Sequence, residues 1–191
     1  MKNYRLLINI VLSGIHKMCG ICGIINFNGE KATKDQLKMM TDAMVHRGPD
    51  DEGFHVSNNI GLAMRRLSII DLNTGHQPIS NEDNSIWVVL NGEIYNYVEI
   101  RKDLQKRGHI FKTKSDTEAI VHLYEEKGIK GLYDLNGMFA FALYDSKKNI
   151  LWIVRDRLGI KPLYYAKLKN KLIFSSDLNS LNKLEKFDIS T

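Results

Sequence analysis

The chain has 191 residues, of which 43% are hydrophobic and 26% charged, and its formal net charge is +5. This length supports one domain with a full core and is short for two, and the composition is that of an ordinary globular protein. The Lys and Arg residues are scattered, without a long basic run interleaved with aromatic side chains, which argues against nucleic acid as a partner. The only two cysteines, Cys19 and Cys22, exclude a disulfide framework, so we expect a reducing compartment and a cytoplasmic protein.

Residues 1–17 differ in character from the rest of the chain. Lys2 and Arg5 precede an apolar stretch at residues 6–12, which Asn9 interrupts. The stretch is much shorter than the roughly 20 apolar residues of a membrane-spanning helix, and no small-x-small cleavage motif follows it. We therefore expect no membrane partner, and we interpret residues 1–17 as sequence upstream of a true start or as a propeptide. A secretory signal is the less favoured alternative.

The first half of the chain alternates strands and helices. A short apolar strand is predicted at residues 24–27, and a capping-box pattern at residues 33–36 predicts the start of a helix. Residues 47–53 are predicted to be a polar loop, and residues 67–72 a strand. The continuous apolar run at residues 86–90 predicts a strand that is covered on both faces.

The second half contains two predicted helices followed by strands. One helix is expected from about residue 96 to a stop at Gly108, and a second capping-box pattern at residues 115–118 predicts another that ends at Gly128. Strands at both ends of the chain with two or three helices between them indicate a layered α+β domain. The predicted C-terminal strands are residues 138–144, 150–154, 163–167 and 172–175.

The residues of the segment Cys19-Gly20-Ile21-Cys22 allow three interpretations: a redox pair, a zinc site or buried structural cysteines. A thioredoxin-like redox pair would open a helix, whereas an apolar strand follows here. A zinc site needs more ligands than two cysteines, and no His-x(3–5)-His pair accompanies them. For Cys22 we therefore favour a buried structural cysteine.

Cys19 is distinguished by the methionine that precedes it. Removal of Met18 as an initiator would leave a residue that carries both a thiol and a free α-amine. Their ordinary pKa values, about 8.5 and about 7.7–8.0, are close enough for proton transfer near neutral pH. The amine can accept the thiol proton and later deliver it to a leaving group, so nucleophile and general base lie in one residue.

The segment MCGICG at residues 18–23 resembles the start of a class II (N-terminal-nucleophile) glutamine amidotransferase. Seven further blocks are similar to the asparagine synthetase branch of that family. Each block is weakly specific by itself, whereas all of them in this order, from Met18 to about Ser176, are highly specific. The blocks are HRGPDDEG (residues 46–53), RLSIID (66–71), GHQP (75–78), NGEIYN (91–96), SDTE (115–118), GMFAFA (137–142) and RDRLGIKPLYY (155–165).

The resemblance implies a fold and a reaction. The expected fold is the four-layer αββα sandwich of N-terminal-nucleophile hydrolases, built mostly from antiparallel sheets. The implied activity is hydrolysis of L-glutamine to glutamate and ammonia, with Cys19 as the nucleophile. This half of the enzyme needs no cofactor and no metal, because ATP and Mg are used by a separate synthetase domain that makes asparagine from aspartate.

Three site residues can be argued from residue type as well as from the resemblance. Arg66 could hold the glutamine carboxylate by two parallel hydrogen bonds, and Asp116 could bind the ammonium or simply cap its helix. A side-chain amide beside an unobstructed backbone N–H, as at Asn91-Gly92, can form an oxyanion hole, although such a dipeptide is by default a turn. The resemblance assigns these roles, and it adds Leu67, Ile69 and Glu93 to the glutamine pocket.

The domain boundaries follow from the same comparison of motifs. We expect an extension at residues 1–17, a glutaminase domain at residues 18–180, and the start of a linker at residues 181–191. The Ser-Gly-Gly loop of the ATP-using domain does not occur, so we expect a truncated chain, an isolated domain or a stand-alone glutaminase with a synthetase domain or subunit as partner. A homodimer and a different ammonia acceptor stay open. The rival hypothesis is a non-catalytic interaction module whose nucleophile is blocked by the extension.

Overall fold

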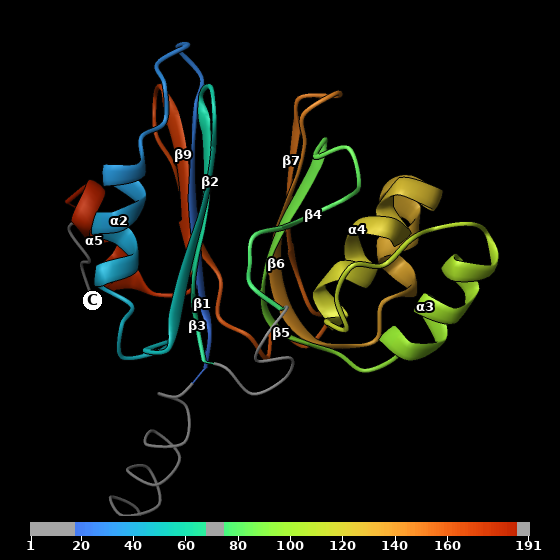
Figure 1. Cartoon of the computed structure of the whole chain (residues 1–191). Coiled ribbons are helices and arrows are strands. Elements are labelled where there is room, and N and C mark those ends of the chain that lie inside the picture. The colour runs from blue at the N-terminus through green and yellow to red at the C-terminus, as the bar shows by residue number, and fades with distance from the viewer. Residues whose placement is uncertain (1–17, 68–74, 187–191) are drawn as a thin grey trace, which may run out of the picture.

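The computed structural model describes residues 18–67 and 75–186, which form two β-sheets packed face to face with helices on both outer sides (Figure 1). The layers are therefore helix, sheet, sheet, helix. This arrangement is the four-layer αββα sandwich that the resemblance implies, so the predicted fold class is confirmed.

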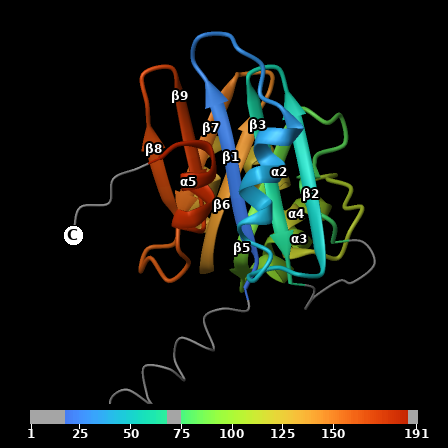
Figure 2. The same ribbon diagram turned by 90° about the vertical axis from the view of Figure 1, so that its left-hand side faces the viewer.

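The first sheet has five antiparallel strands in the order β2-β3-β1-β9-β8. Helices α2 and α5 cover its outer face and also contact each other, as Figure 2 shows. The elements of this half are β1 (Gly20–Asn26), α2 (Lys34–Asp42), β2 (Asp51–Ser57), β3 (Ile60–Arg66), β8 (Tyr164–Lys167), β9 (Lys171–Ser175) and α5 (Leu178–Leu184).

The second sheet has four antiparallel strands in the order β4-β5-β6-β7. Its outer face is covered by α4, against which α3 and a 3-10 helix pack. The elements of this half are β4 (Ile79–Ser80), β5 (Ile86–Ile94), α3 (Tyr97–Lys106), α4 (Asp116–Lys127), the 3-10 helix η1 (Gly128–Asp134), β6 (Gly137–Asp145) and β7 (Ile150–Arg155).

Successive side chains of a strand point to opposite faces of its sheet, so β1 and β5 each contribute to two layers of the hydrophobic core. One layer lies between the two sheets, and the other lies between each sheet and its helices. On β1, Ile21 points into the layer between the sheets, whereas Cys22 packs under α2. On β5, Val89 points into the same middle layer, whereas Leu90 packs under α4. A strand that is buried on both faces is continuously apolar, as the sequence of β5 predicts. Full burial of Cys22 confirms its interpretation as a structural cysteine.

Three sequence-based assignments along these strands are wrong. Strand β5 does not stop at Asn91 but continues through Gly92 to Ile94, because β6 pairs with it along its whole length. Residues 51–53 belong to β2 rather than to a polar loop, since backbone pairing to β3 fixes their conformation despite their charge. The strand predicted at residues 67–72 does not begin at Leu67, which lies outside any strand directly after the end of β3 at Arg66. The other residues of that predicted strand lie outside the described residues.

The two predicted capping boxes differ in outcome. The box at Thr33 is confirmed, with reciprocal hydrogen bonds to Gln36. At α4, Ser115 caps the helix through the N–H of Thr117, but Glu118 does not return the second bond of a box. Its carboxylate instead accepts hydrogen bonds from the segment that precedes the helix. The last helix, α5, was not predicted and crosses residue 180, at which the sequence suggested the domain end.

Candidate functional site

One cavity opens where the strand ends of both sheets meet the start of α4. Its lining brings together residues that are more than 90 positions apart in the chain, including six of the eight predicted site residues. Of the other two, Asn91 lies beside the cavity on β5, and Ile69 lies outside the described residues. The lining consists of Cys19, Arg66, Leu67, Gly75, Gln77, Leu90, Gly92, Glu93, Ser115, Asp116 and Thr117.

Cys19 lies immediately before β1, with its thiol against the backbone at the end of β3. The backbone N–H of Leu67 donates to Sγ at 3.4 Å, and Sγ lies 3.7 Å from the carbonyl oxygen of the same residue. Burial raises the pKa of the Cys19 thiol, while the Leu67 N–H and the positive charges of Arg66 and Lys161 act in the opposite direction. The thiol is thus held in place, and it needs a base before it can act as a nucleophile at neutral pH.

Two buried cations lie beside Cys19. Arg47 donates from both Nε and Nη2 to the carbonyl oxygen of Cys19, at 3.3 Å each. Lys161 places its Nζ 2.9 Å from Sδ of Met18, and burial lowers the pKa of its ammonium against the opposing charges of Glu93 and Cys19. Sequence reasoning gave neither residue a specific role, although both belong to blocks that carried the resemblance.

Asn91 is linked to the nucleophile strand by a serine that the sequence did not single out. The side-chain amide of Asn91 donates to Oγ of Ser176 at 3.3 Å, and the same Oγ accepts the N–H of Ile21 at 3.1 Å. Asn91 is 1% exposed, and its Oδ1 has no hydrogen-bond partner within residues 18–67 and 75–186. The Ser176 hydroxyl therefore joins the strand of the thiol to the strand of the amide across the two sheets.

Gly92 occupies a position that only glycine fits. Its φ is +140°, and a Cβ there would lie 2.1 Å from the carbonyl oxygen of Met138 on β6. An L-residue would be strained in this conformation and would also collide with backbone. Since the strand continues through this position, Gly92 brings its main chain to the cavity without a turn.

Asp116 opens α4 with its carboxylate facing the cavity. Its Oδ2 accepts the backbone N–H of Ile94 at 2.9 Å, and the hydroxyl of Ser115 lies 3.4 Å from its Oδ1. Burial raises the pKa of the Asp116 carboxyl, the nearby charge of Glu93 adds to the effect, and backbone N–H groups oppose it. Two carboxylates in one cavity create a site that is suited to a cationic group.

Gln77 braces the other side of the cavity. Its Oε1 accepts the N–H of Leu90 at 2.6 Å, and its Nε2 donates to the hydroxyl of Thr117 at 3.2 Å. The side chain thus connects β5 to the first turn of α4. The sequence marked Gln77 only as part of a motif block, because a brace of this kind depends on which strands become neighbours.

Comparisons with known proteins identify the family of this chain. A family model described as a glutamine amidotransferase domain matches residues 18–191. Asparagine synthetase [glutamine-hydrolyzing] 2 of Bacillus subtilis is 54% identical over 167 residues, which cover 86% of this chain and 22% of the relative. Asparagine synthetase B of Escherichia coli is 45% identical over 77% of this chain and 26% of the relative. A probable asparagine synthetase of Dictyostelium discoideum is 43% identical over 86% of this chain and 30% of the relative. The chain thus spans less than a third of the length of these relatives.

Solved structures with the same fold are more distant in sequence. A glutamine phosphoribosylpyrophosphate amidotransferase from B. subtilis superposes with a TM-score of 0.71 at 20% identity, over 87% of this chain and 43% of that one. A structure titled the allosteric regulatory enzyme of purine biosynthesis gives a TM-score of 0.73 at 19% identity, with the same coverage. At this level of identity the two structures support the fold alone. Among the described residues, no helix is both long enough and apolar enough to cross a membrane.

Proposed function

This chain belongs to the family of class II glutamine amidotransferase domains, in the branch of the glutamine-hydrolysing asparagine synthetases, and we propose that it hydrolyses the side-chain amide of L-glutamine. Cys19 is the nucleophile of this proposal. Arg66, Leu67, Ile69, Glu93 and Asp116 bind the substrate, and Asn91 with Gly92 stabilises the oxyanion.

The composition of the cavity is the observation that carries the proposal. Glutamine presents a carboxylate, an ammonium group and an amide. The cavity presents a guanidinium from Arg66, carboxylates from Glu93 and Asp116, and the thiol of Cys19. Each substrate group therefore has a partner of complementary charge or reactivity.

The reaction proceeds in two displacements. The α-amine of an N-terminal Cys19 removes the thiol proton, and Sγ attacks the amide carbon to form a tetrahedral oxyanion. The oxyanion collapses, the proton passes from the α-ammonium to the leaving nitrogen, and ammonia departs from a γ-glutamyl thioester. Water then hydrolyses the thioester, which releases glutamate and regenerates the thiol.

The contacts of Asn91 support its assignment as one of two hydrogen-bond donors to the oxyanion. A side-chain amide carries two N–H groups, so one can stay bonded to Ser176 while the other points at the oxyanion. The backbone N–H of Gly92 supplies the second donor. A donor of this kind is worth about 3–4 kcal/mol of transition-state stabilisation.

The proposed base requires that Cys19 be the first residue of the working enzyme. An amide nitrogen after Met18 has no useful basicity, and loss of a general base costs about 10²–10⁴ in rate. We accordingly interpret residues 1–17 as an extension that is absent from the active form, together with Met18. The catalytic domain begins at Cys19 and includes α5, which packs on α2.

The fate of the ammonia is inferred from the relatives' names. Two of them are named asparagine synthetases and a third a probable one, so we propose that the ammonia is delivered to a synthetase domain or subunit. That partner would use ATP and Mg to convert aspartate to asparagine in the cytoplasm, and this half would need no cofactor of its own. A homodimer is compatible with this arrangement.

The deciding experiment compares three purified proteins: the full chain, a form that starts at Cys19, and that form with Cys19→Ala. Intact mass establishes which N-terminus each carries, and release of glutamate and ammonia measures turnover. The form starting at Cys19 is expected to be active, and the form that retains residues 1–18 is expected to be at least about 10²-fold slower. Activity that survives Cys19→Ala would remove the thiol from the mechanism. An inactive protein with a verified N-terminal Cys19 would instead favour the non-catalytic module.

A further inference from the structure

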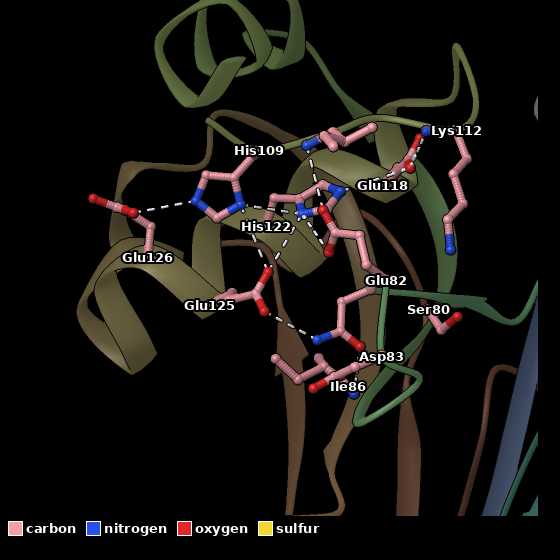
Figure 3. A network of polar contacts seen from close by, with 12 residues as sticks. Ser80, Glu82, Asp83, Ile86, His109, Lys112, Glu118, His122, Glu125 and Glu126 are labelled. Atoms are coloured by element: carbon pink, nitrogen blue, oxygen red, sulfur yellow. Dashed lines mark hydrogen bonds and ion pairs between the residues drawn. The ribbon is translucent and has the colours of Figure 1, made fainter. Parts of the chain in front are cut away.

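Two imidazoles and a carboxylate converge at the surface end of α4, outside the glutamine cavity (Figure 3). His109 lies on the segment between α3 and α4, whereas His122 and Glu125 lie on α4 itself. The Nδ1 atoms of the two histidines are 3.3 Å apart. Oε2 of Glu125 is 3.6 Å from Nδ1 of His109 and 3.5 Å from Nδ1 of His122.

The other ring nitrogen of each histidine faces a different carboxylate. Nε2 of His109 lies 3.1 Å from Oε2 of Glu126, and Nε2 of His122 lies 3.6 Å from Oε1 of Glu118. The hydrogen bond between Nε2 of His109 and Glu126 favours the tautomer that carries its hydrogen on Nε2, which leaves the lone pair on Nδ1. Glu118 faces Nε2 of His122 in the same sense but without a hydrogen bond. This carboxylate–histidine arrangement is the one that commonly orients histidines toward a metal ion.

The consequence is that three electron-pair donors point at one another. With both hydrogens on Nε2, no hydrogen lies between the two Nδ1 atoms and Glu125 Oε2, so the contact is repulsive unless a cation fills it. Bonds of about 2.0–2.2 Å to a tetrahedral zinc ion place neighbouring ligand atoms about 3.3–3.6 Å apart. The observed separations of 3.3, 3.5 and 3.6 Å are close to that spacing.

The carboxylates at this place are also held by contacts of their own. Oε1 of Glu125 accepts a hydrogen bond from Nδ2 of the buried Asn81 at 3.1 Å, which leaves Oε2 directed at the histidines. Glu82 places its Oε2 3.8 Å from Nδ1 of His122, while its Oε1 accepts the N–H of Ile110 at 3.3 Å. The side chain of His122 is 1% exposed, whereas those of Glu125 and Glu82 are 35% and 39% exposed. A cation can therefore enter from solvent and rest against a buried ligand.

We propose that His109, His122 and Glu125 bind a divalent cation of the zinc type, with Glu82 or a water molecule in the fourth position. Imidazole ligands favour zinc and its neighbours over magnesium or calcium, which prefer sites built from oxygen alone. Glu125 is eight residues along α4 from Thr117, about 12 Å from the cavity at the rise of an α-helix. The ion would clip the segment before α4 onto the helix, and it takes no part in glutamine chemistry.

Zinc binding to the full chain tests the proposal directly. The protein carries Cys19→Ala so that the thiol cannot act as a rival ligand, and residual metal is removed with a chelator. Calorimetric titration with Zn²⁺ should give one site per chain, and Mg²⁺ in excess should not compete. Co²⁺ in place of Zn²⁺ should give the visible absorption of a four-coordinate ion, and Zn²⁺ should raise Tm.

Matched variants assign the ligands. His109→Ala should abolish the site, and Glu125→Gln, which can keep the bond to Asn81, should abolish it or weaken it strongly. Glu126→Gln removes the charged partner of His109 Nε2, together with an exposed ion pair to Arg107, and should weaken binding by about 10–100-fold. His46→Ala, a half-exposed histidine outside the cluster, should bind like the parent.

Two results would overturn the proposal. One is the absence of a stoichiometric zinc site in the parent chain, which would mean that a proton on a histidine fills the gap. The other is unchanged binding in Glu125→Gln together with His109→Ala. If His109→Ala fails to fold by circular dichroism, the partly exposed Glu125→Gln decides alone.

Discussion

Replacement of Ser176 by alanine tests whether one hydroxyl couples the two sheets at the active site. Ser176 Oγ accepts two hydrogen bonds, from the N–H of Ile21 at 3.1 Å and from the amide of Asn91 at 3.3 Å. Both donors are fully or almost fully buried. Alanine fits the space but leaves both N–H groups without that acceptor.

The magnitude follows from the cost of an unsatisfied buried donor. Each such group costs about 1–3 kcal/mol, so Ser176→Ala should destabilise the fold by about 2–6 kcal/mol before relaxation. A domain of this kind is stable by only about 5–15 kcal/mol, so the loss is readily measured. Activity should also fall, by as much as about 10²-fold, because the Asn91 amide is no longer oriented as an oxyanion donor.

Ser180 supplies a matched control, because it is also fully buried but its Oγ has no hydrogen-bond partner in the part of the chain that the structure describes. Ser180→Ala removes a desolvated hydroxyl from α5 and adds helix propensity, so it should be neutral or slightly stabilising. Urea unfolding at equal slope, together with the glutaminase rate, measures both variants. Equal midpoints for the two would show that the bonds of Ser176 contribute nothing, and the proposed coupling would be abandoned.

Three further predictions concern other described residues. Gly92→Ala should destabilise the chain strongly and abolish activity, because its Cβ would collide with the carbonyl of Met138. Gly108→Ala, also at positive φ but with open space around it, should lower the free energy of unfolding in urea by only about 1–3 kcal/mol. Similar losses for the two variants would refute the proposed collision. Asp116→Asn should lower kcat/KM for glutamine by about 10–150-fold, because the substrate ammonium loses a charged partner. The free energy of unfolding at pH 7 should stay the same or rise, since burial raises the pKa of this carboxyl and disfavours its ionised form. An unchanged kcat/KM would exclude Asp116 from ammonium binding. Burial opposes ionisation of Glu118, but hydrogen bonds from Thr113 and Lys112, together with the nearby ring of His122, outweigh it and lower the pKa of this carboxyl from 4.5 to about 2. The ionised carboxylate stabilises the fold by on the order of 3 kcal/mol above pH 4.5, and this contribution is lost as the pH falls toward 2. In Glu118→Gln, the free energy of unfolding should therefore fall less steeply between pH 4.5 and 2. The same pH dependence in variant and parent would show that Glu118 does not cause it.

Local sequence rules were sufficient for most of the elements. The apolar runs of β1 and β5 reflect strands that are buried on both faces, and such a run is a property of neighbouring residues. The capping box at Thr33 was confirmed for the same reason, since all its partners lie within four positions. The rules failed at residues 51–53 and at Asn91-Gly92, where a neighbouring strand paired with backbone that looked like loop or turn.

The chemistry of the site was accessible from residue type and motif order. Cys19, Arg66 and Asp116 were identified as nucleophile, carboxylate partner and ammonium partner, and the cavity contains all three. Their roles stay predictions until the variants are measured. Arg47, Lys161 and Ser176 escaped a specific role because each acts through a contact with a residue far away in the chain.

The sequence by itself determined the kinds of chemical group that this chain carries and the order in which they occur. Only the tertiary structure decided which of them meet. Ser176 lies 85 residues from Asn91 and 155 from Ile21, yet one hydroxyl bonds both. His109 and His122 are 13 residues apart in the chain, and they face each other because the segment before α4 folds back on the helix. The physical reason is that hydrogen bonds and ligand geometry act over about 3 Å in space, whereas sequence patterns record only distance along the chain.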